Sequence, residues 1–573
     1  MIRDLQGVVS LPSWDMPMSH MKTHWLPYAI RISSSITPPP LLIVLLLAAL
    51  SPVIGYVVYY AFFHPLAKYP GPFWGKFTGL RAAYHAWIGD VHIDMWKCHE
   101  KYGPYVRYSP NYLLMNTTQS YKDVYGHNKN VRKSLAYLAM VHKTPSTFTL
   151  MDRHEHAWKK RILSQKLSDS ATRSFEPKIT GMIDRFCEYV CPASTGKENT
   201  VSKPFNMSEM CDYLFFDLVT SIVFGENFDL IRSPWYRHIP PALARSNERI
   251  SVIVQWPYVV WRRMDKVLFR NSVAGRKDFL RFAHNLVTER VQRGSGDDVL
   301  SGLLDAADPT TGNKLTQDEI VAESILMLVA GEYPSVKAYT QLTTSGSDTS
   351  STLLASLFFY LTRNPDKKDR LTREVRSKFS TREEICLGPA LNSCRFLYAC
   401  IMECLRLTPP VAAAPFREVL KGGMIVDGHY VPEGTNVGTG LFSIQHNQEY
   451  FYDPFEFIPE RWLSEGKHAG AHNPDAHVPF SIGPRVCLGR ALAHAELSLA
   501  MAIICWKMDF NVVESMKDIG AGNENAEYGR HRPGEFQLHY GSATYTREES
   551  LENHNPYALS NPPTPTPHSN DSM

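Results

Sequence analysis

The sequence predicts a mainly helical protein with a membrane helix near its N-terminus, and three segments support this fold class. Residues 41–63 form a 23-residue run without a charged side chain, long enough to span a bilayer with some tilt. Phe396 to Leu407 and Ala491 to Trp506 carry apolar residues at helical spacing, and Pro409 follows the first of them. One large domain is expected, because no Gly/Ser-rich linker or internal repeat divides the middle of the chain.

Composition narrows the classes of function that the chain can have. A length of 573 residues with 44% hydrophobic residues is sufficient for a large core. The net charge of +3 is too small to indicate a nucleic-acid partner. The ten cysteines are scattered and include no C-x-x-C pair, which fits a reducing compartment rather than a disulfide-rich secreted protein.

The N-terminal part is expected to attach the domain to a membrane. The apolar run is too long for the core of a cleaved signal peptide. Prolines in residues 64–72 prevent helix continuation and predict a stiff, extended hinge. Residues 1–40 are longer than a usual leader, which leaves Met16, Met18 or Met21 as alternative translation starts. The expected order is leader (1–40), transmembrane anchor (41–63), hinge (64–72), catalytic domain (73–540) and disordered proline-rich tail (541–573).

The stretch from Phe480 to Gly489 places one cysteine, Cys487, in a glycine-bounded loop directly before an apolar helix. A thiolate there would lie near helix-terminal N–H groups, which lower its pKa and make it an anionic ligand. Gly483 and Gly489 permit the turns and close approach that a flat macrocycle lying on the sulfur requires. Arg485 can pair with a carboxylate of that macrocycle. The alternative is a buried cysteine in an ordinary loop.

The spacing Phe-x-x-Gly-x-Arg-x-Cys-x-Gly resembles the haem-binding loop of the cytochrome P-450 superfamily of haem-thiolate monooxygenases. The wording of the hinge, His-Pro-Leu-Ala-x-Tyr-Pro-Gly-Pro, resembles that of fungal microsomal members. The resemblance covers about residues 64–513 and implies a large helical domain with a small β region, whose first strand lies within Tyr102 to Pro110. It also implies that Cys487 is the axial ligand of the iron of haem b, in a loop with Phe480, Gly483, Arg485 and Gly489.

Three charged residues are predicted to form a structural network. Glu403 and Arg406 lie three residues apart on the helix predicted over 396–407 and share one face. Arg461 follows in Pro459-Glu460-Arg461-Trp462. An exposed helical salt bridge, worth only ~0.3–0.5 kcal/mol, is the alternative. By resemblance to the Glu-x-x-Arg and Pro-Glu-Arg motifs, the three residues form a buried ion-paired network under the haem.

The carboxylates of haem need cationic or hydrogen-bonding partners. His156 and Arg161 resemble the helix segment that fungal members often write His-x-x-x-Arg-Arg, so both are candidates for the propionates. A solvated basic helix face is the alternative for this segment. Arg417 matches the strand arginine that commonly meets a propionate in the family. The alanines at 412–414 would leave space above the haem for substrate.

The oxygen-activating helix is interrupted by an anomalous insert. Ile320 to Gly331 reads as a helix, and Asp348 and Thr349 continue a similar pattern. Without residues 332–346 the sequence resembles the family motif Ala-Gly-x-(Asp/Glu)-Thr, in which Thr349 hydrogen-bonds oxygen and Asp348 feeds protons toward it. As written, fifteen residues separate the two halves, ~22 Å if they were helical.

Two origins of this insert remain open. The codons for Gly331 to Tyr333 and for Ser345-Gly346 can contain splice donor and acceptor sequences, and fifteen codons keep the reading frame. Our hypothesis is that residues 332–346 are a short retained intron in the gene model. A genuine surface loop is the alternative, because long insertions are tolerated where they reach solvent.

The resemblance implies a P-450 monooxygenase that uses O2 on a lipophilic small molecule, in a fungal style often found in secondary metabolism. Electrons would come from NADPH through the membrane cytochrome P-450 reductase. The expected location is the endoplasmic reticulum membrane, single-pass, with the catalytic domain in the cytosol and no nucleic-acid partner. Two alternatives are a haem-binding but inactive chain whose insert disrupts the oxygen-activating helix, and an isomerase or dehydratase that needs no reductase.

Overall fold

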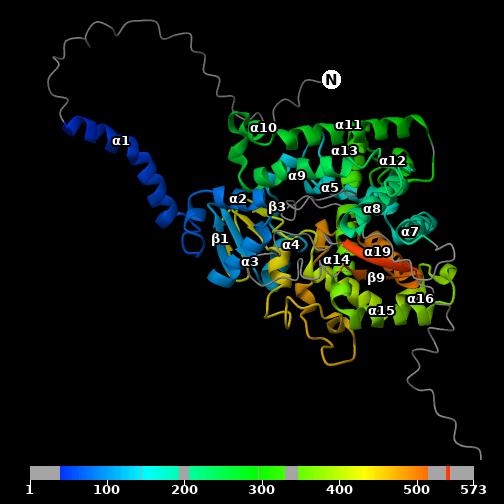
Figure 1. Ribbon diagram of the computed structural model, residues 1–573. Helices are drawn as coiled ribbons and strands as arrows, with labels where there is room; N and C mark the ends of the chain where they lie inside the picture. The colour runs from blue at the N-terminus through cyan, green and yellow to red at the C-terminus, as the bar shows by residue number, and fades with distance from the viewer. Residues whose placement is uncertain are drawn as a thin grey trace, which may run out of the picture. The chain divides into compact units, whose positions relative to one another are not determined.

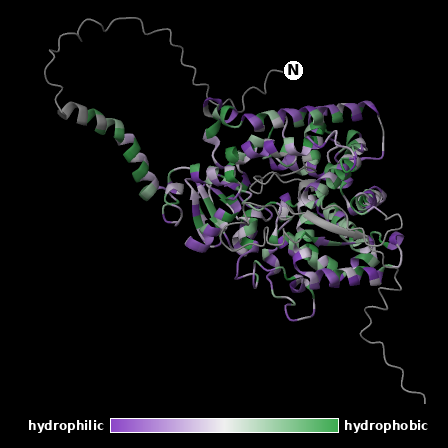
Figure 2. Ribbon diagram, in the orientation of Figure 1, coloured by the Kyte–Doolittle hydropathy of each residue, from purple (hydrophilic) through white to green (hydrophobic). Residues whose placement is uncertain are grey.

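The computed structural model describes residues 39–141, 143–192, 205–294, 296–329, 346–513 and 537–542 (Figure 1). The chain divides into two compact units, Met1–Tyr59 and Tyr60–Met573. In the first unit the described part is the helix α1, Pro39–Val58, which contains Pro52. Figure 2 shows that α1 consists of apolar and neutral residues, whereas helices such as α15 carry many hydrophilic ones.

A bilayer-crossing helix was expected over residues 41–63. Within the described ranges, no helix combines the length and the apolarity that crossing a membrane requires. The helix α1 ends at Val58, and Tyr59–Phe63 continue as a π-helical turn, η1. The transmembrane anchor is therefore not shown by the structure.

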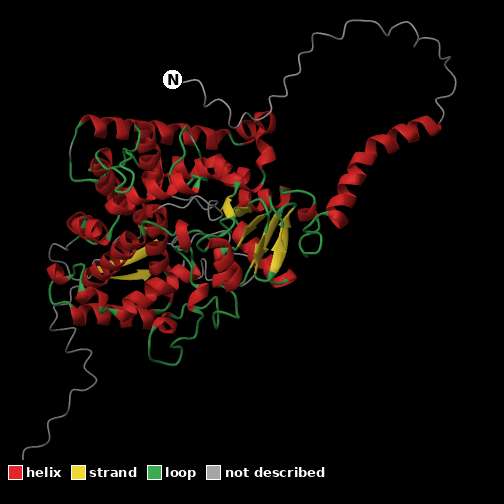
Figure 3. Ribbon diagram, turned by 180° about the vertical axis from the view of Figure 1, so that it is seen from behind, coloured by secondary structure: helices red, strands yellow, loops and turns green. Residues whose placement is uncertain are grey.

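The second unit is mainly helical, as predicted, with strands gathered into small sheets (Figure 3). Its α-helices are α2 (Leu80–Ile88), α3 (Val91–Tyr102), α4 (Thr118–Tyr125), α5 (Arg153–Lys166), α6 (Asp169–Ser174), α7 (Glu176–Val190), α8 (Met207–Phe224), α9 (Ile239–Gln255), α10 (Met264–Leu268), α11 (Arg270–Gln292), α12 (Val299–Leu304), α13 (Gln317–Val329), α14 (Gly346–Arg363), α15 (Pro365–Lys378), α16 (Pro389–Asn392), α17 (Arg395–Leu407), α18 (Leu441–Gln445) and α19 (Arg490–Lys507).

Three sheets make up the β structure of the described ranges. The largest has the order β1-β2-β8-β5-β3, in which β2 and β8 run parallel and the other neighbours antiparallel. The strands are β1 (Tyr105–Ser109), β2 (Tyr112–Met115), β3 (Val131–Lys133), β4 (Phe205–Asn206), β5 (Arg417–Val419), β6 (Met424–Val426), β7 (His429–Val431), β8 (Asn436–Gly438), β9 (Met508–Val512) and β10 (Gln537–Ser542). The strand expected within residues 102–110 is β1, which confirms the small β region.

Local sequence explains where several helices begin and end. Thr117 caps α4 by accepting a hydrogen bond from the Ser120 backbone N–H, and Ser120 closes a reciprocal capping box. The helix α8 ends at Gly225, whose φ of +68° is the left-handed conformation that glycine adopts without strain. The helix α15 begins at Pro365, because proline has no N–H to leave unpaired in a first turn.

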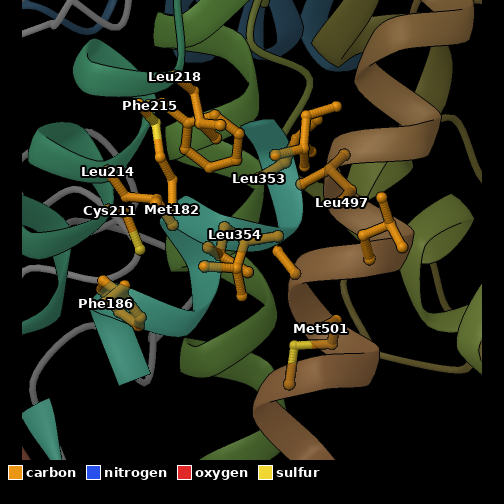
Figure 4. Packing of buried hydrophobic residues seen from close by; sticks show 14 of the residues in the cluster. Met182, Phe186, Cys211, Leu214, Phe215, Leu218, Leu353, Leu354, Leu497 and Met501 are labelled. Carbon is orange, nitrogen blue, oxygen red and sulfur yellow. The ribbon is translucent and has the colours of Figure 1, made fainter. Parts of the chain in front are cut away.

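The main core lies where α7, α8, α14 and α19 meet. Figure 4 shows Leu353 and Leu354 of α14 among apolar side chains of the other three helices. Phe215 of α8 is fully buried, as is Leu497 of α19. Burying a side chain of this size stabilises the fold by about 1.5–3 kcal/mol. The position of α14 is therefore set by packing on both of its sides.

The structure differs from the expected segment boundaries or leaves them untested at three places. The hinge at 64–72 is not a free extended connector, because Leu66 and Tyr69 are buried in a core cluster and Pro70 accepts a backbone hydrogen bond from Arg107. The insert at 332–346 lies outside the described residues except for Gly346, where α14 begins. The strand β10 runs to Ser542, two residues past the expected domain end at 540.

The core predicts a contrast between two phenylalanines. Phe215→Ala should destabilise the protein by about 3–5 kcal/mol, because it leaves a cavity in the main core. Phe73→Ala should cost less than ~1 kcal/mol, because Phe73 is 65% exposed. Chemical unfolding followed by tryptophan fluorescence measures both, and equal losses of stability would contradict this placement of the core.

Candidate functional site

The loop before α19 is a tightly closed turn. The backbone N–H of Cys487 donates to the carbonyl oxygen of Phe480 at 2.9 Å. Inside the turn, Ser481 and Gly483 have φ values of +59° and +70°. A Cβ at Gly483 would lie 2.3 Å from the backbone oxygen of Tyr125, so glycine is required there for space as well as for conformation.

Cys487 is an exposed residue, although neighbouring atoms crowd its thiol and the loop lies against the helical core. The sequence predicts that the pKa of this thiol is lowered. In the protein without a ligand, the pKa is raised instead. Burial by surrounding atoms raises the pKa of Cys487, while the N–H of Gly489 and the charges of Lys160 and Arg490 act to lower it. The prediction was wrong for the free protein because desolvation outweighs these groups. Coordination to a metal ion would deprotonate the thiol outright.

Apolar surface beside the thiol is left open to a flat ligand. Phe480, Leu488 and Leu492 are only partly buried, although they pack against the main core. A Cβ at Gly489 would lie 4.0 Å from the sulfur, so a larger side chain would extend into the space next to it. The φ of Gly489 is −81°, which any residue can adopt, so space rather than backbone conformation explains this glycine.

A buried pair of like charges lies on the largest sheet. Lys133 of β3 and Arg417 of β5 are directly opposite each other in register. Both are buried, and neither has an ion-pair partner among the described residues. Burial and the charges of Arg417 and Arg485 lower the pKa of Lys133 well below its ordinary value. The neighbouring cross-strand pair, Arg132 and Glu418, is by contrast complementary, at 3.0 Å.

Two further basic groups complete this arrangement. Burial and Arg417 lower the pKa of Arg485 to about 10, and Arg485 donates only two long bonds of 3.5 Å to backbone oxygens. Burial and Arg485 lower the pKa of His156, on α5, to about 3. We call Lys133, His156, Arg417 and Arg485 the basic cluster. Cations directly opposite one another destabilise a sheet, so an anion bound beside the basic cluster would stabilise the protein.

Arg161 does not belong to the basic cluster. Its guanidinium forms two hydrogen bonds with the carboxylate of Asp308, at 2.6 and 2.8 Å. This ion pair holds the pKa of Asp308 far below its ordinary value. Arg161 was expected to meet a haem propionate, and its pairing with Asp308 gives it a different role. Lys133, which the motif comparison did not single out, lies opposite Arg417 and is a further candidate to meet a propionate.

Glu403, Arg406 and Arg461 form one fully buried ion-paired network, as the motifs imply. Arg406 makes two hydrogen bonds to the Glu403 carboxylate, at 2.8 and 3.0 Å, and Arg461 approaches it at 3.1 Å. Burial alone would raise the pKa of Glu403, but the two arginines hold it below its ordinary value. The indole N–H of Trp462 donates to the same carboxylate at 2.8 Å. The alternative of an exposed salt bridge is excluded, because all three side chains are inaccessible.

The residues expected to handle oxygen lie at the start of α14. Thr349 is in the first turn of this helix and is half-buried. Asp348 belongs to the same turn, but its side chain falls outside the described part. Ala330 and Gly331 lie outside the described residues as well, so their expected approach to Thr349 stays a prediction.

Two buried acids were missed by sequence reasoning. Glu496 of α19 is buried, which raises its pKa to about 8, and Glu323 of α13 is buried, which raises its pKa to about 7. A lone glutamate inside an apolar helix run is a signal that a buried acid is present. The sequence also contained an indication that Lys133 is buried. Arg132 and Lys133 are consecutive on a strand, so their side chains point to opposite faces of the sheet, and one of the two faces the interior.

These residues fit a haem group. Cys487 would supply a thiolate ligand, partly buried apolar residues lie beside its sulfur, and the basic cluster would meet two carboxylates with cations and a histidine. The observation that carries this test is the buried pair of Lys133 and Arg417, which lie opposite each other without an ion-pair partner among the described residues. Backbone oxygens and aromatic rings contact both cations, but no carboxylate of the described residues does.

Comparisons with known proteins agree with this geometry. The family model described as "Cytochrome P450" matches residues 65–521. "Cytochrome P450 monooxygenase AKT7" of Alternaria alternata is 40% identical over 499 residues, which cover 85% of this chain and 93% of that protein. "Cytochrome P450 monooxygenase poxM" of Penicillium oxalicum is 40% identical over 464 residues, which cover 80% of this chain and 87% of that protein.

Solved structures show the same fold. The cytochrome P450DA haem domain superposes with a TM-score of 0.63 at 17% identity, covering 80% of this chain and 94% of that one. Retinoic acid bound cyanobacterial CYP120A1 gives a TM-score of 0.61 at 21% identity, covering 82% and 99%.

The basic cluster predicts opposite effects on apoprotein stability and haem binding. Lys133→Met should leave the haem-free protein as stable as before or more stable, because a desolvated like charge is removed. The same change should weaken haem binding about 10- to 100-fold, because a charge-assisted bond to a propionate is lost. Haem titration and chemical unfolding of the apoprotein measure the two effects. Arg132→Met, on the other face of β3, is the matched control, and equal haem affinities of both variants would refute the cluster.

The buried network predicts a large loss of stability. Glu403→Gln should destabilise the protein by about 3–5 kcal/mol, because Arg406 and Arg461 keep buried charges without compensation. Glu460→Gln should cost less than ~1 kcal/mol, because its bond to Arg370 is partly exposed. Urea unfolding of both variants checks this, and similar losses would show that the network is no more important than a surface pair.

Proposed function

The chain belongs to the cytochrome P450 family and is a P450 monooxygenase, and from this premise we propose that it inserts one oxygen atom from O2 into a lipophilic small molecule. The fungal relatives and the hinge sequence favour a substrate from secondary metabolism. The alanines 412–414, which are buried close to the basic cluster at Arg417, fit the role of small residues that leave room for such a substrate.

The observation that carries this proposal is the combination of an exposed cysteine in a closed loop with an uncompensated basic cluster. Cys487 would be the axial ligand, and Lys133, Arg417, Arg485 and His156 would hold the two propionates. When bound, haem supplies the activation of O2 that protein side chains alone lack. The protein holds the macrocycle flat through the apolar residues of the loop and neutralises its carboxylates.

The helix α14 would supply the proton chemistry. We propose that the hydroxyl of Thr349 donates a hydrogen bond to bound oxygen and that Asp348 delivers protons toward it. Thr349 is half-buried, which agrees with a side chain facing a sheltered space.

Electrons would come from NADPH through a cytochrome P450 reductase. Two cations, Lys160 and Arg490, lie near Cys487 and lower the pKa of its thiol. Arg490 is exposed and begins α19, so it is available to an acidic protein surface. Charge complementarity of this kind speeds docking more than it strengthens the complex.

We further propose attachment to the cytosolic face of the endoplasmic reticulum membrane through residues 41–63. The described part of α1 has several largely exposed apolar side chains, including Val44, Leu45 and Leu47. Exposed Trp74 and Trp87 add aromatic residues of the kind found at membrane interfaces. Fractionation of fungal cells checks this proposal, since recovery of the full chain in the high-speed supernatant would contradict it.

The function can be tested with two forms of the protein, each produced together with a reductase. One form is the full chain and the other lacks residues 332–346. Both forms should bind haem and give the carbon monoxide spectrum of a thiolate-ligated iron. We expect the shortened form to convert substrate, found by comparing metabolites with those of a deletion strain.

Each result that differs from this expectation supports one alternative function or overturns the assignment of Cys487. The thiolate spectrum without NADPH-dependent product in either form indicates an inactive haem protein. Product formed without the reductase indicates an isomerase or dehydratase. Product from the full chain at the rate of the shortened form shows that residues 332–346 are a tolerated loop, and absence of the thiolate spectrum from both forms overturns the assignment of Cys487.

A further inference from the structure

The start of α14 carries two consecutive buried hydroxyls that bind two acids from different helices. Ser350 donates to a carboxyl oxygen of Glu496, on α19, at 3.1 Å. Ser351 donates to a carboxyl oxygen of Asp212, on α8, at 2.5 Å. All four side chains are at most 4% exposed. We call these four residues the acid clamp.

The acid clamp lies one turn before the apolar contacts of α14. Figure 4 shows Leu354 of α14 between Cys211 and Leu214 on one side and Leu497 on the other. Asp212 follows Cys211 in α8, and Glu496 precedes Leu497 in α19. The polar and apolar contacts therefore join the same three helices, but only the hydrogen bonds depend on direction.

The geometry of the clamp fixes the rotation of α14. Consecutive residues lie about 100° apart around a helix, so the two hydroxyls reach partners in different directions. A slip by one residue would turn the helix by about 100° and move it 1.5 Å along its axis, which would break both bonds. Apolar packing alone would tolerate small rotations, because dispersion contacts are not directional.

Glu496 makes its contact as a neutral acid. Burial raises the pKa of Glu496 to about 8, and Ser350 is its hydrogen-bonding side-chain neighbour. No charged group contributes to this shift in the described residues, so the contact needs no counter-ion. One carboxyl oxygen of Glu496 has no protein partner there, which makes Ser350 the contact that compensates its burial.

We propose that Ser350–Glu496 and Ser351–Asp212 are positioning contacts that set the rotation of α14 and thereby aim the hydroxyl of Thr349 at bound oxygen. This rests on the proposed monooxygenase function. Ser350 and Ser351 follow residues 332–346 in the chain, and their partners Asp212 and Glu496 come from α8 and α19. The clamp therefore holds Thr349 by contacts that do not involve residues 332–346.

The clamp itself is tested by a double-mutant cycle on the full chain. Ser350→Ala and Glu496→Leu should each lower the urea midpoint, and the double variant should lose less than the sum, because both changes remove one contact. Ser356→Ala is the matched control, since Ser356 is buried on the same helix and bonds only to the backbone of Thr352. Additive losses for Ser350 and Glu496 would overturn the clamp.

The positioning of the Thr349 hydroxyl is tested by two measurements that a simple loss of stability does not change. The infrared stretch of carbon monoxide on the haem-loaded protein senses hydrogen-bond donors beside the bound gas and requires no turnover. The stretch should shift or broaden in Ser350→Ala and Glu496→Leu. It should keep its wild-type frequency in Glu496→Gln, because the glutamine can still accept a hydrogen bond from Ser350. It should also stay unchanged in the control Ser356→Ala. In the form that turns over, the fraction of NADPH lost through O2 + NADPH + H⁺ → H2O2 + NADP⁺ should rise several-fold in the same two variants.

The outcomes separate this proposal from the proposed function. An unchanged stretch and peroxide fraction in Ser350→Ala and Glu496→Leu would overturn the positioning role, even if wild-type protein makes product. If wild-type protein binds haem without turnover in either form, the monooxygenase proposal fails, while the infrared shift still decides the clamp. Should Glu496→Leu fail to fold, Ser351→Ala and Asp212→Asn take its place, with the same expected shift for the alanine variant and retention in the asparagine variant.

Discussion

The buried carboxylate of Glu403 is the constraint on which the thiol side of the site depends. An isolated buried charge would be very unfavourable, and two arginines, an indole N–H and the backbone N–H of Ile458 compensate it. The arginines in turn donate to backbone oxygens of the segment that leads toward the cysteine loop, including Pro454 and Ala471. Directed bonds to one carboxylate thus fix a long irregular segment that has little secondary structure of its own.

The basic cluster shows the opposite principle. The network around Glu403 is electrostatically complete within the protein, whereas Lys133 and Arg417 face each other without an anion. Repulsion between two buried like charges destabilises the sheet. A ligand that supplies negative charge would relieve this repulsion. Arg132 and Glu418, one position away, show that the same strands can pair opposite charges where no ligand is intended. The charges of the basic cluster would therefore favour a bound anionic group.

The two walls of the haem site are held in different ways. A turn with positive φ at Ser481 and Gly483 shapes the cysteine loop, whereas apolar packing and hydrogen bonds to Glu496 and Asp212 hold α14. Because burial raises the pKa of Glu496 to about 8, the contact of Ser350 with Glu496 adds little negative charge near neutral pH.

The sequence by itself predicted Cys487 as the axial ligand, and it located the helices that carry Glu403 and Thr349 and the members of the ion-paired network. These follow from spacing, since residues three apart share a helix face and glycines mark the turns that flank Cys487. Only the tertiary structure decided the partners of the basic residues, because Arg161 pairs with Asp308 and strand register places Lys133 opposite Arg417. It also decided the direction of the Cys487 pKa and the contacts of Glu496, since desolvation and partners from distant helices arise only when the chain is packed.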